Sequence, residues 1–421
     1  MSAEETGTKG VYYGWVMVGL CMVALMLAAG TTINAFGLYV LPASKDLGLS
    51  RAAMNTGLIV MSAGSAVASL VVGRIIDRYP PKLVMAISGI GLGVSQVVLG
   101  LSHSLWLSAL VLMLPVAFAM NGLGLVTSPA LVTRWFAVRR GRAMAITLMG
   151  MSMSTILVIP PLAWLIERVG WRQSLVTIGC IVPVVILLML PFVRPQPGSH
   201  EHEPVVAAGA DPAAPMPAAG GVLLSPLQLL ALPRFWALAI ANAVGTSFFQ
   251  GLVVSIVPIG RDLGLSSTKA ASLISVVGLA GMSGKLMVVW LGERFDRRLA
   301  LTGLYATLAV AGALLLVGGS YAMLFAGCAL IGLCAGASLP VYPALLADQI
   351  GAKSFGTAYG MSLFAGAVVG AALVRFSGEV FDRTGRYDLL FYAFIAMGAL
   401  AALLVWSVRP AASHEMMAPA E

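Results

Sequence analysis

Charged residues are scarce in this chain, and their scarcity decides its class. Only 10% of the 421 residues are Asp, Glu, Lys or Arg, whereas 59% are hydrophobic. A soluble domain carries roughly 25% charged residues, and a water-soluble core of this size could not bury so many apolar side chains. We therefore predict an integral protein of the lipid bilayer.

Motifs for metal binding, nucleotide binding and catalysis are also lacking. The four cysteines lie within apolar segments, without the spacing of a zinc site or a disulfide framework. No G-x-x-x-x-G-K-S/T loop is present, which argues against ATP-driven transport. Acid and histidine clusters are absent too, so we expect no enzyme, no cofactor and no bound metal. The net charge of +8 does not indicate a nucleic-acid partner, because the basic residues fall between apolar runs.

The sequence does contain many apolar runs of about 20 residues, the length that crosses a bilayer as a helix. Twelve such runs are found, at residues 14–40, 52–73, 83–101, 105–133, 143–166, 173–193, 235–259, 270–291, 299–318, 321–347, 356–378 and 388–408. Residues 194–233, rich in Pro, Ala and Gly, are typical of a flexible linker. We predict an all-α fold of twelve transmembrane helices in two six-helix halves, residues 1–193 and 234–409, with a tail at 410–421.

The basic residues predict the orientation of the chain. If the N-terminus is cytoplasmic, the cytoplasmic segments hold 15 lysines and arginines and the opposite segments hold 8. Cytoplasmic loops carry an excess of Lys and Arg, so both termini and the linker are expected in the cytoplasm. The first apolar run begins near Tyr12 and lacks a cleavage site after it, so we interpret it as a retained helix.

The two halves repeat a pattern of charges in their loops. Residues 73–82 read GRIIDRYPPK after the second run, and residues 290–298 read WLGERFDRR after the eighth. The sequence RRGRAMA at 139–145 is echoed by KSFGTAYG at 353–360. Anchoring by basic residues alone would not require an acid before an arginine at the same place in both halves. The residues that we predict to act in conformational change are Asp77, Arg78, Arg139, Arg140, Arg142, Glu293 and Arg294.

On these loop motifs the chain resembles the major facilitator superfamily over nearly its whole length. Residues 12–15 (YYGW), 121–131 (NGLGLVTSPAL) and 272–285 are similar to the monocarboxylate transporter and oxalate:formate antiporter families. Those families carry an arginine in helix eight that pairs with the substrate carboxylate, and Lys285 falls at that position. Two halves of six helices, with the substrate site between them at the midplane, are the architecture of many secondary transporters.

Some features of these families are missing. Animal monocarboxylate transporters place an aspartate one turn before the cation, where this chain has Gly281. They also have a lysine in the outer part of helix one, where residues 36–38 read FGL. The oxalate:formate type has a second cation in helix eleven, where residues 363–366 read LFAG. The proton coupling and substrate size that the resemblance implies therefore lack their usual residues here.

Lys285 stands alone inside an apolar run. It lies eight residues before Glu293, the next charge, or roughly 12 Å along a helix. All 17 acidic residues fall in loops, tails or helix ends, so the interior offers no fixed counter-charge. A buried cation without a partner loses its proton or seeks an anion, and an anionic substrate would supply one. The alternative is a side chain that snorkels to the nearer surface.

Arg375 is the other cation within an apolar run, about 10 Å from the outer end of helix eleven. It either clamps a carboxylate or pairs with Glu379 one turn on. Buried polar groups in the apolar runs either orient a small acid or form interhelical hydrogen bonds. The residues that we predict to bind substrate are Lys285, Asn121, Tyr342, Arg375, Asn34 and Tyr359.

We interpret the chain as a secondary active transporter of a small organic monocarboxylate. It would work by alternating access as a monomer in a bacterial inner membrane, with a proton or a counter-anion as the coupled partner. The alternatives are an exchanger of dicarboxylates or aromatic acids, and a drug efflux pump of the same fold, which would need no buried cation. A membrane sensor would need a folded output domain, for which the linker is too short.

Overall fold

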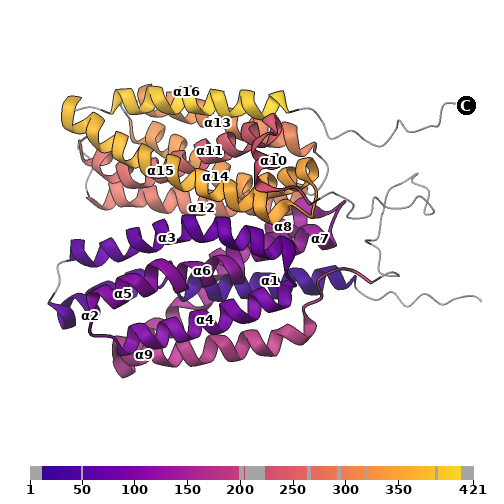
Figure 1. Cartoon of the computed structure of the whole chain (residues 1–421). Coiled ribbons are helices and arrows are strands. Elements are labelled where there is room, and N and C mark those ends of the chain that lie inside the picture. Colours follow the sequence, from indigo (N-terminus) through magenta and orange to yellow (C-terminus); the bar gives the residue numbers. More distant parts are fainter. Residues whose placement is uncertain are drawn as a thin grey trace, which may run out of the picture.

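The computed structural model describes most of the chain (Figure 1). The described residues are 12–48, 51–198, 203, 223–262, 267–291, 295–317, 320–384 and 387–408. Helices account for nearly all of this part, and no strand occurs in it. The predicted all-α fold is confirmed.

The helices form two sets of membrane crossings, which we call the first half and the second half. The first half consists of α1 (Tyr13–Gly30), α2 (Phe36–Leu47), α3 (Arg51–Arg78), α4 (Pro81–Leu101), α5 (Leu105–Val111), η1 (Leu112–Val116), α6 (Ala117–Met120), η2 (Asn121–Leu125), α7 (Thr127–Trp135), α8 (Arg140–Leu157), α9 (Ile159–Met189) and η3 (Leu190–Phe192). After the short α10 (Pro226–Leu230), the second half consists of α11 (Pro233–Asp262), α12 (Ser267–Leu291), α13 (Arg297–Val317), α14 (Tyr321–Ile350), α15 (Phe355–Thr384) and α16 (Asp388–Ser407).

Eleven stretches of the described chain are long and apolar enough to cross a membrane. One of them, residues 140–192, is 53 residues long, which is about 80 Å of helix, and it therefore crosses twice. Within it Gly170 has φ +81°, a conformation that glycine adopts without steric cost, and the chain turns back there. The described residues thus contain the twelve crossings that the sequence predicts.

The first crossing is broken, although the sequence predicts one uninterrupted run at 14–40. α1 and α2 are separated by a turn at residues 31–35. The hydroxyls of Thr31 and Thr32 donate to carbonyl oxygens four residues earlier, a type of hydrogen bond that bends helices. The fourth crossing, α5–α7, contains the π-helical turns η1 and η2, and the second of these begins at Asn121.

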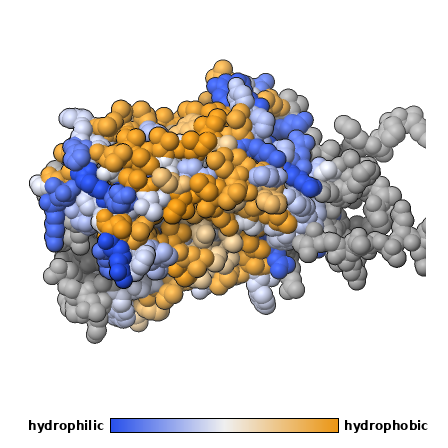
Figure 2. Space-filling model, turned by 90° about the horizontal axis from the view of Figure 1, so that it is seen from below, coloured by the Kyte–Doolittle hydropathy of each residue, from blue (hydrophilic) through white to orange (hydrophobic). Residues whose placement is uncertain are grey.

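An apolar belt surrounds the bundle. In Figure 2 hydrophobic residues cover the middle of the visible face, and hydrophilic residues gather toward its two ends. Outward-facing apolar side chains come from both halves, for example Leu188, which is 68% exposed, and Leu403, which is 66% exposed. Such a belt is expected of helices that face lipid, where no water is present to bind polar groups.

The two halves lie against each other as two layers (Figure 1). α3 packs against α15, and α8 packs against both α12 and α14. We call the end of the bundle where α3, α12 and α14 end and α8 begins the linker side, and the other end the opposite side. The predicted boundaries of the linker, residues 194 and 233, remain a prediction, because most of that segment lies outside the described residues.

α3 and α15 meet backbone to backbone toward the linker side. A Cβ atom at Gly73 would overlap the carbonyl oxygen of Gly356, and one at Gly360 would overlap that of Ser69. Ser69 Oγ also donates a hydrogen bond to the carbonyl oxygen of Gly360, at 2.9 Å. Small residues permit such close approach of helices in a membrane, so these glycines set how closely the two halves meet.

We expect Gly73→Ala to separate the halves on the linker side, because the added methyl group needs the space that Gly356 occupies. Overpacking of this kind costs about 1–3 kcal/mol, which opening of the linker side would relieve. Spin labels at the exposed positions 79 and 353 should move apart in pulsed electron resonance. The control is Gly91→Ala, since a Cβ there meets no atom within 4 Å. Identical distances in the two variants would contradict the prediction.

Candidate functional site

Lys285 lies on α12 and reaches across to the first half. Its ammonium donates a hydrogen bond to the hydroxyl of Ser152 on α8, with Nζ and Oγ 2.8 Å apart. Both side chains are half-buried. Within the described part of the chain, no acidic side chain forms an ion pair with this ammonium. The lysine therefore joins the two halves through a neutral partner.

Helix geometry directs Lys285 toward the middle of the bilayer. Cα–Cβ bonds tilt toward the N-terminus of a helix, and α12 begins on the opposite side, so the side chain points away from the linker side. Its partner Ser152 comes twelve residues after Arg140, the first residue of α8, or roughly 18 Å along that helix. The observed arrangement is therefore not that of a lysine that snorkels to the nearer surface.

Glycines hold α12 against α14 next to Lys285. A Cβ atom at Gly336 would overlap the carbonyl oxygen of Gly281, and one at Gly284 would overlap that of Leu333. Position 281, one turn before the lysine, therefore faces the backbone of α14. A Cβ atom at position 281, where animal monocarboxylate transporters have an aspartate, would lie 3.3 Å from the carbonyl oxygen of Gly332, which is a tight contact for a side chain.

Asn34, in the turn between α1 and α2, lies on a different face of α8 from Lys285. Its Nδ2 donates to Ser154 Oγ at 2.6 Å, two residues beyond the partner of Lys285. Residues two apart on a helix do not face the same way. The structure thus does not bring Asn34 into contact with the lysine.

Asn121 is buried inside the first half, at the start of the π-helical turn η2. Only 1% of its surface is exposed. Its Nδ2 donates to Ser65 Oγ at 2.8 Å and to the carbonyl oxygen of Ala117 at 2.9 Å. Its Oδ1 has no hydrogen-bond partner among the described residues, and π-helical turns often occur at functional sites.

Tyr342 and Tyr359 lie together in the second half, between α14 and α15. Their ring centroids are 6.4 Å apart, and the ring of Tyr359 stacks on that of Phe355 at 5.2 Å. The Tyr342 hydroxyl donates to Ser362 Oγ at 2.5 Å. These two predicted site residues therefore share one aromatic cluster, which has no hydrogen bond to Lys285.

Arg375 has an exposed side chain on α15. The carboxylate of Glu379 pairs with Arg383, one turn further on, and not with Arg375 as the alternative from the sequence required. No hydrogen bond or ion pair of Arg375 is found in the part of the chain that the structure describes. Its predicted role as a second carboxylate clamp remains a prediction.

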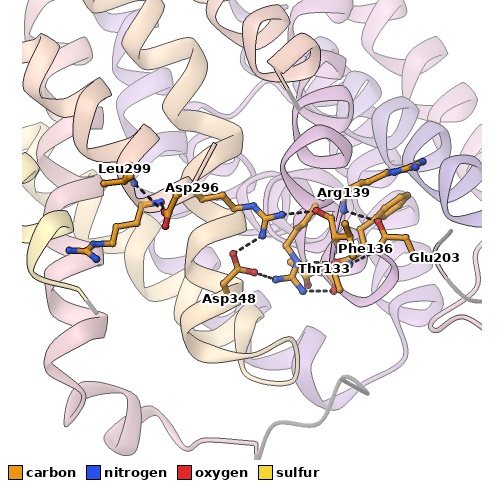
Figure 3. A network of polar contacts seen from close by, with 12 residues as sticks. Thr133, Phe136, Arg139, Glu203, Asp296, Leu299 and Asp348 are labelled. Carbon is orange, nitrogen blue, oxygen red and sulfur yellow. Dashed lines mark hydrogen bonds and ion pairs between the residues drawn. The ribbon is translucent and has the colours of Figure 1, made fainter. Parts of the chain in front are cut away.

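On the linker side, Asp348 at the end of α14 receives two arginines (Figure 3). Arg140, the first residue of α8, forms an ion pair with one carboxylate oxygen, and Arg297 of α13 forms one with the other at 2.6 Å. Arg297 also donates to the carbonyl oxygen of Val138 at 2.9 Å. Arginine and aspartate thus connect the first half to the second at this end.

Asp77 makes a second connection on the linker side. Its carboxylate accepts hydrogen bonds from the backbone N–H groups of Gly356, at 2.9 Å, and Thr357, at 2.6 Å. These amides belong to the first turn of α15, where helices leave N–H groups unpaired and carry partial positive charge. An acid of the first half therefore caps a helix of the second half.

Glu203 binds the beginning of α8. Its carboxylate accepts hydrogen bonds from the backbone N–H groups of Ala137, Val138 and Arg139 at 2.7–2.9 Å. Figure 3 shows it on the other side of this backbone from Asp348. Glu203 is 3% exposed, so a residue of the predicted linker is part of this network.

The remaining residues with predicted conformational roles differ in their surroundings. Arg78 and Arg142 have exposed side chains, whereas Arg139 is half-buried. Glu293 and Arg294 lie outside the described residues. The sequence reasoning did not identify Ser152, Glu203, Arg297 or Asp348. Only the basic–acidic repeat of the loops hinted at Arg297.

Two six-helix halves that meet at a membrane-embedded cation define a multi-pass membrane transport protein. The chain belongs to the major facilitator superfamily, whose family model matches residues 19–372 and 238–420. The family predicted from the loop motifs is thereby confirmed. Its members are transporters and not enzymes.

Similar proteins include carriers of organic anions. Human monocarboxylate transporter 11 is 27% identical over 420 residues, covering 95% of this chain and 83% of the relative. The oxalate:formate antiporter of Oxalobacter formigenes is 25% identical over 293 residues, covering 66% of this chain and 64% of the relative. The crystal structure of the human organic anion transporter MFSD10 has the same fold, with a TM-score of 0.69 and 18% identity over 93% of this chain and 99% of that chain.

We expect Asp77→Asn to loosen the first turn of α15, because the amide accepts fewer hydrogen bonds and carries no negative charge. Loss of a capping carboxylate costs about 0.5–2 kcal/mol. Hydrogen–deuterium exchange of the peptide that contains Gly356 and Thr357 should accelerate several-fold. The control is Arg74→Gln, at another exposed position of α3. Equal exchange in the two variants would show that Asp77 does not hold this turn.

Proposed function

We propose that the protein is a secondary active transporter of small organic monocarboxylates in which Lys285 binds the carboxylate. The observation that carries the proposal is the position of this ammonium, which lies between the halves and bonds to Ser152. A serine hydroxyl offsets only part of the cost of placing a charge in an apolar medium. A carboxylate would form a charge-assisted hydrogen bond, roughly twice as strong as a neutral one.

The depth of Lys285 supports alternating access. Toward the linker side of it, the halves are joined by the Asp348 ion pairs, by Asp77 on the amides of α15 and by the contact of Gly73 with Gly356. A substrate that reaches Lys285 from the opposite side meets these contacts as a closed gate. Release to the linker side then requires that the two halves separate there.

The positions of the other predicted site residues suggest different roles. Tyr342 and Tyr359 would shape the wall of the second half, and Asn121 that of the first. Asn34 would position α8 through its hydrogen bond to Ser154, on a face of that helix away from Lys285. Arg375 would attract anions near the opposite side. No described acidic side chain pairs with Lys285, so the coupled proton would travel on the substrate or on Lys285 itself.

Exchange of one anion for another is the second candidate, favoured by the similarity to the oxalate:formate antiporter and by a cation paired with no acid. We place the protein in a bacterial inner membrane with both termini and the linker side in the cytoplasm, as the basic residues predict. We further propose a monomer, because one chain supplies both halves of the proposed Lys285 site.

Lys285→Gln should abolish carboxylate uptake into vesicles, because glutamine can donate a hydrogen bond but cannot neutralise an anion. We expect a loss of at least a hundredfold in the initial rate, as for truncation of one partner of a charged pair, which costs about 3–5 kcal/mol. Lys353→Gln, at an exposed position of the linker side, should leave uptake unchanged. Normal uptake by a folded Lys285→Gln protein would refute the proposal.

Ser152→Ala should lower the apparent KM for the carboxylate about fivefold, because Ser152 and the substrate compete for the same ammonium. A typical hydrogen bond contributes about 1 kcal/mol net, which corresponds to this factor. Ser283→Ala, at an exposed position two residues before Lys285 on α12, is the matched control. A higher KM in Ser152→Ala would mean that the serine binds substrate instead of competing with it.

The need for internal anion distinguishes the two candidate modes of transport. A proton symporter should accumulate labelled carboxylate in vesicles that hold no anion when a pH gradient is imposed. An exchanger should take up no label into such vesicles and should accumulate it only when unlabelled anion fills them. Lys285→Gln should fail in either assay.

A further inference from the structure

The first half contains a cavity of about 470 Å³ that is separate from the Lys285 contact. Its walls come from the turn after α1, from α2, α3, α5, η1 and α9, and from the end of α4 with the loop that follows it. No residue of α8 or of the second half lines it. Small-molecule sites in proteins occupy about 300–1,000 Å³, so the cavity is large enough for a ligand.

The wall of this first-half cavity is apolar and aromatic. Phe36, Tyr39, Trp106 and Trp171 contribute rings, and the lining includes no Asp, Glu, Lys or Arg. The one histidine of the lining, His103, lies in the loop after α4. An ionised carboxylate at the inner end would therefore lose its hydration without gaining a charged partner, which is costly. The chemistry of the wall therefore selects an uncharged molecule with aromatic surface.

At the inner end of the cavity, the side-chain oxygen of Gln96 is a hydrogen-bond acceptor that no described group donates to. Gln96 lines the cavity about 8 Å along α4 from the surface loop that follows that helix. Its Nε2 donates to the carbonyl oxygen of Thr31 at 3.1 Å, which fixes the orientation of the amide. Its Oε1 is buried and accepts no hydrogen bond from the described residues, although such a group costs about 1–3 kcal/mol when unpaired.

The neighbouring hydroxyls of Thr31 and Thr32 do not donate a hydrogen bond to Gln96 Oε1. Thr31 Oγ1 and Thr32 Oγ1 each use their proton on a carbonyl oxygen of α1. Both threonines line the cavity and are less than 8% exposed. The inner end therefore offers acceptors, and a ligand that matches it brings its own O–H or N–H group.

We propose that the first-half cavity is a second small-molecule site, for an uncharged aromatic molecule that donates one hydrogen bond, as a phenol does. The rings of the wall pack on the aromatic body, and the hydroxyl donates to Gln96 Oε1. The proposal does not rest on carboxylate binding at Lys285, because the two sites share no residue.

The test is calorimetric titration of the full-length protein in detergent with 1-naphthol. We expect saturable binding of one molecule per chain. Gln96→Met keeps the length of the side chain but removes the acceptor, and it should weaken 1-naphthol about fivefold. 1-Methoxynaphthalene has no donor and should bind equally to the parent and to Gln96→Met.

Two substitutions on α3 locate the ligand. Val60 lines the cavity, and Val60→Phe should reduce 1-naphthol binding at least tenfold by filling the space. Ile59 is 68% exposed, so Ile59→Phe adds the same ring on the outside and should leave binding unchanged. Lys285→Gln should also leave it unchanged.

Several results would overturn this assignment. Non-saturable uptake of 1-naphthol would indicate partition into detergent, and full binding by Val60→Phe would exclude the cavity. Loss of binding in Lys285→Gln would move the ligand to the contact between the halves. Equal affinity of Gln96→Met and the parent for 1-naphthol would remove the role of the amide, even if Gln96→Met is less stable.

Discussion

The cost of charge in an apolar medium determines how this protein is arranged. Most acidic and basic groups of the described residues lie toward the ends of the bundle, and there they pair across the halves, as Asp348 does with Arg140. Lys285 instead lies well inside α12 and bonds only to a hydroxyl among the described residues. A cation at this depth that pairs with no acid of the described residues favours an anion that arrives from outside, and this imbalance of charge is the basis of the proposed selectivity.

The contacts that close the linker side depend on backbone as much as on side chains. Asp77 binds amide groups of α15, Glu203 binds amide groups before α8, and glycines let α3 and α15 touch. Asp77 satisfies amide groups that the beginning of α15 leaves unpaired, and the glycines leave room for the two backbones to approach. The halves therefore meet largely through backbone groups, which every helix has. A few acidic side chains determine which backbone groups are paired.

Much of the fold could be predicted from the sequence, because a bilayer demands apolar runs of fixed length. Asp77 and Arg140 were recognised from the repeat of loop charges, and Lys285 from its isolation. Their partners were not, since Ser152 and Glu203 carry no signal in a sequence where serines and loop acids are common. The break after α1 was missed as well, because Thr31 and Thr32 are compatible with an apolar run. Contacts between halves follow from how whole helices pack, and the apolar residues of α12 are spread over all its sides, so its pattern gives no preferred face.

One helix, α8, takes part both in the contact with Lys285 and in the ion pair on the linker side. α8 begins with Arg140 in the ion pair with Asp348 and holds Ser152 under Lys285, roughly 18 Å further along. A helix of this length is stiff, so it can serve as a lever whose two ends cannot respond independently. Binding of a substrate at Lys285 and separation of Arg140 from Asp348 then become one rigid-body movement of α8. No chain of intermediate side chains is needed to couple the two events.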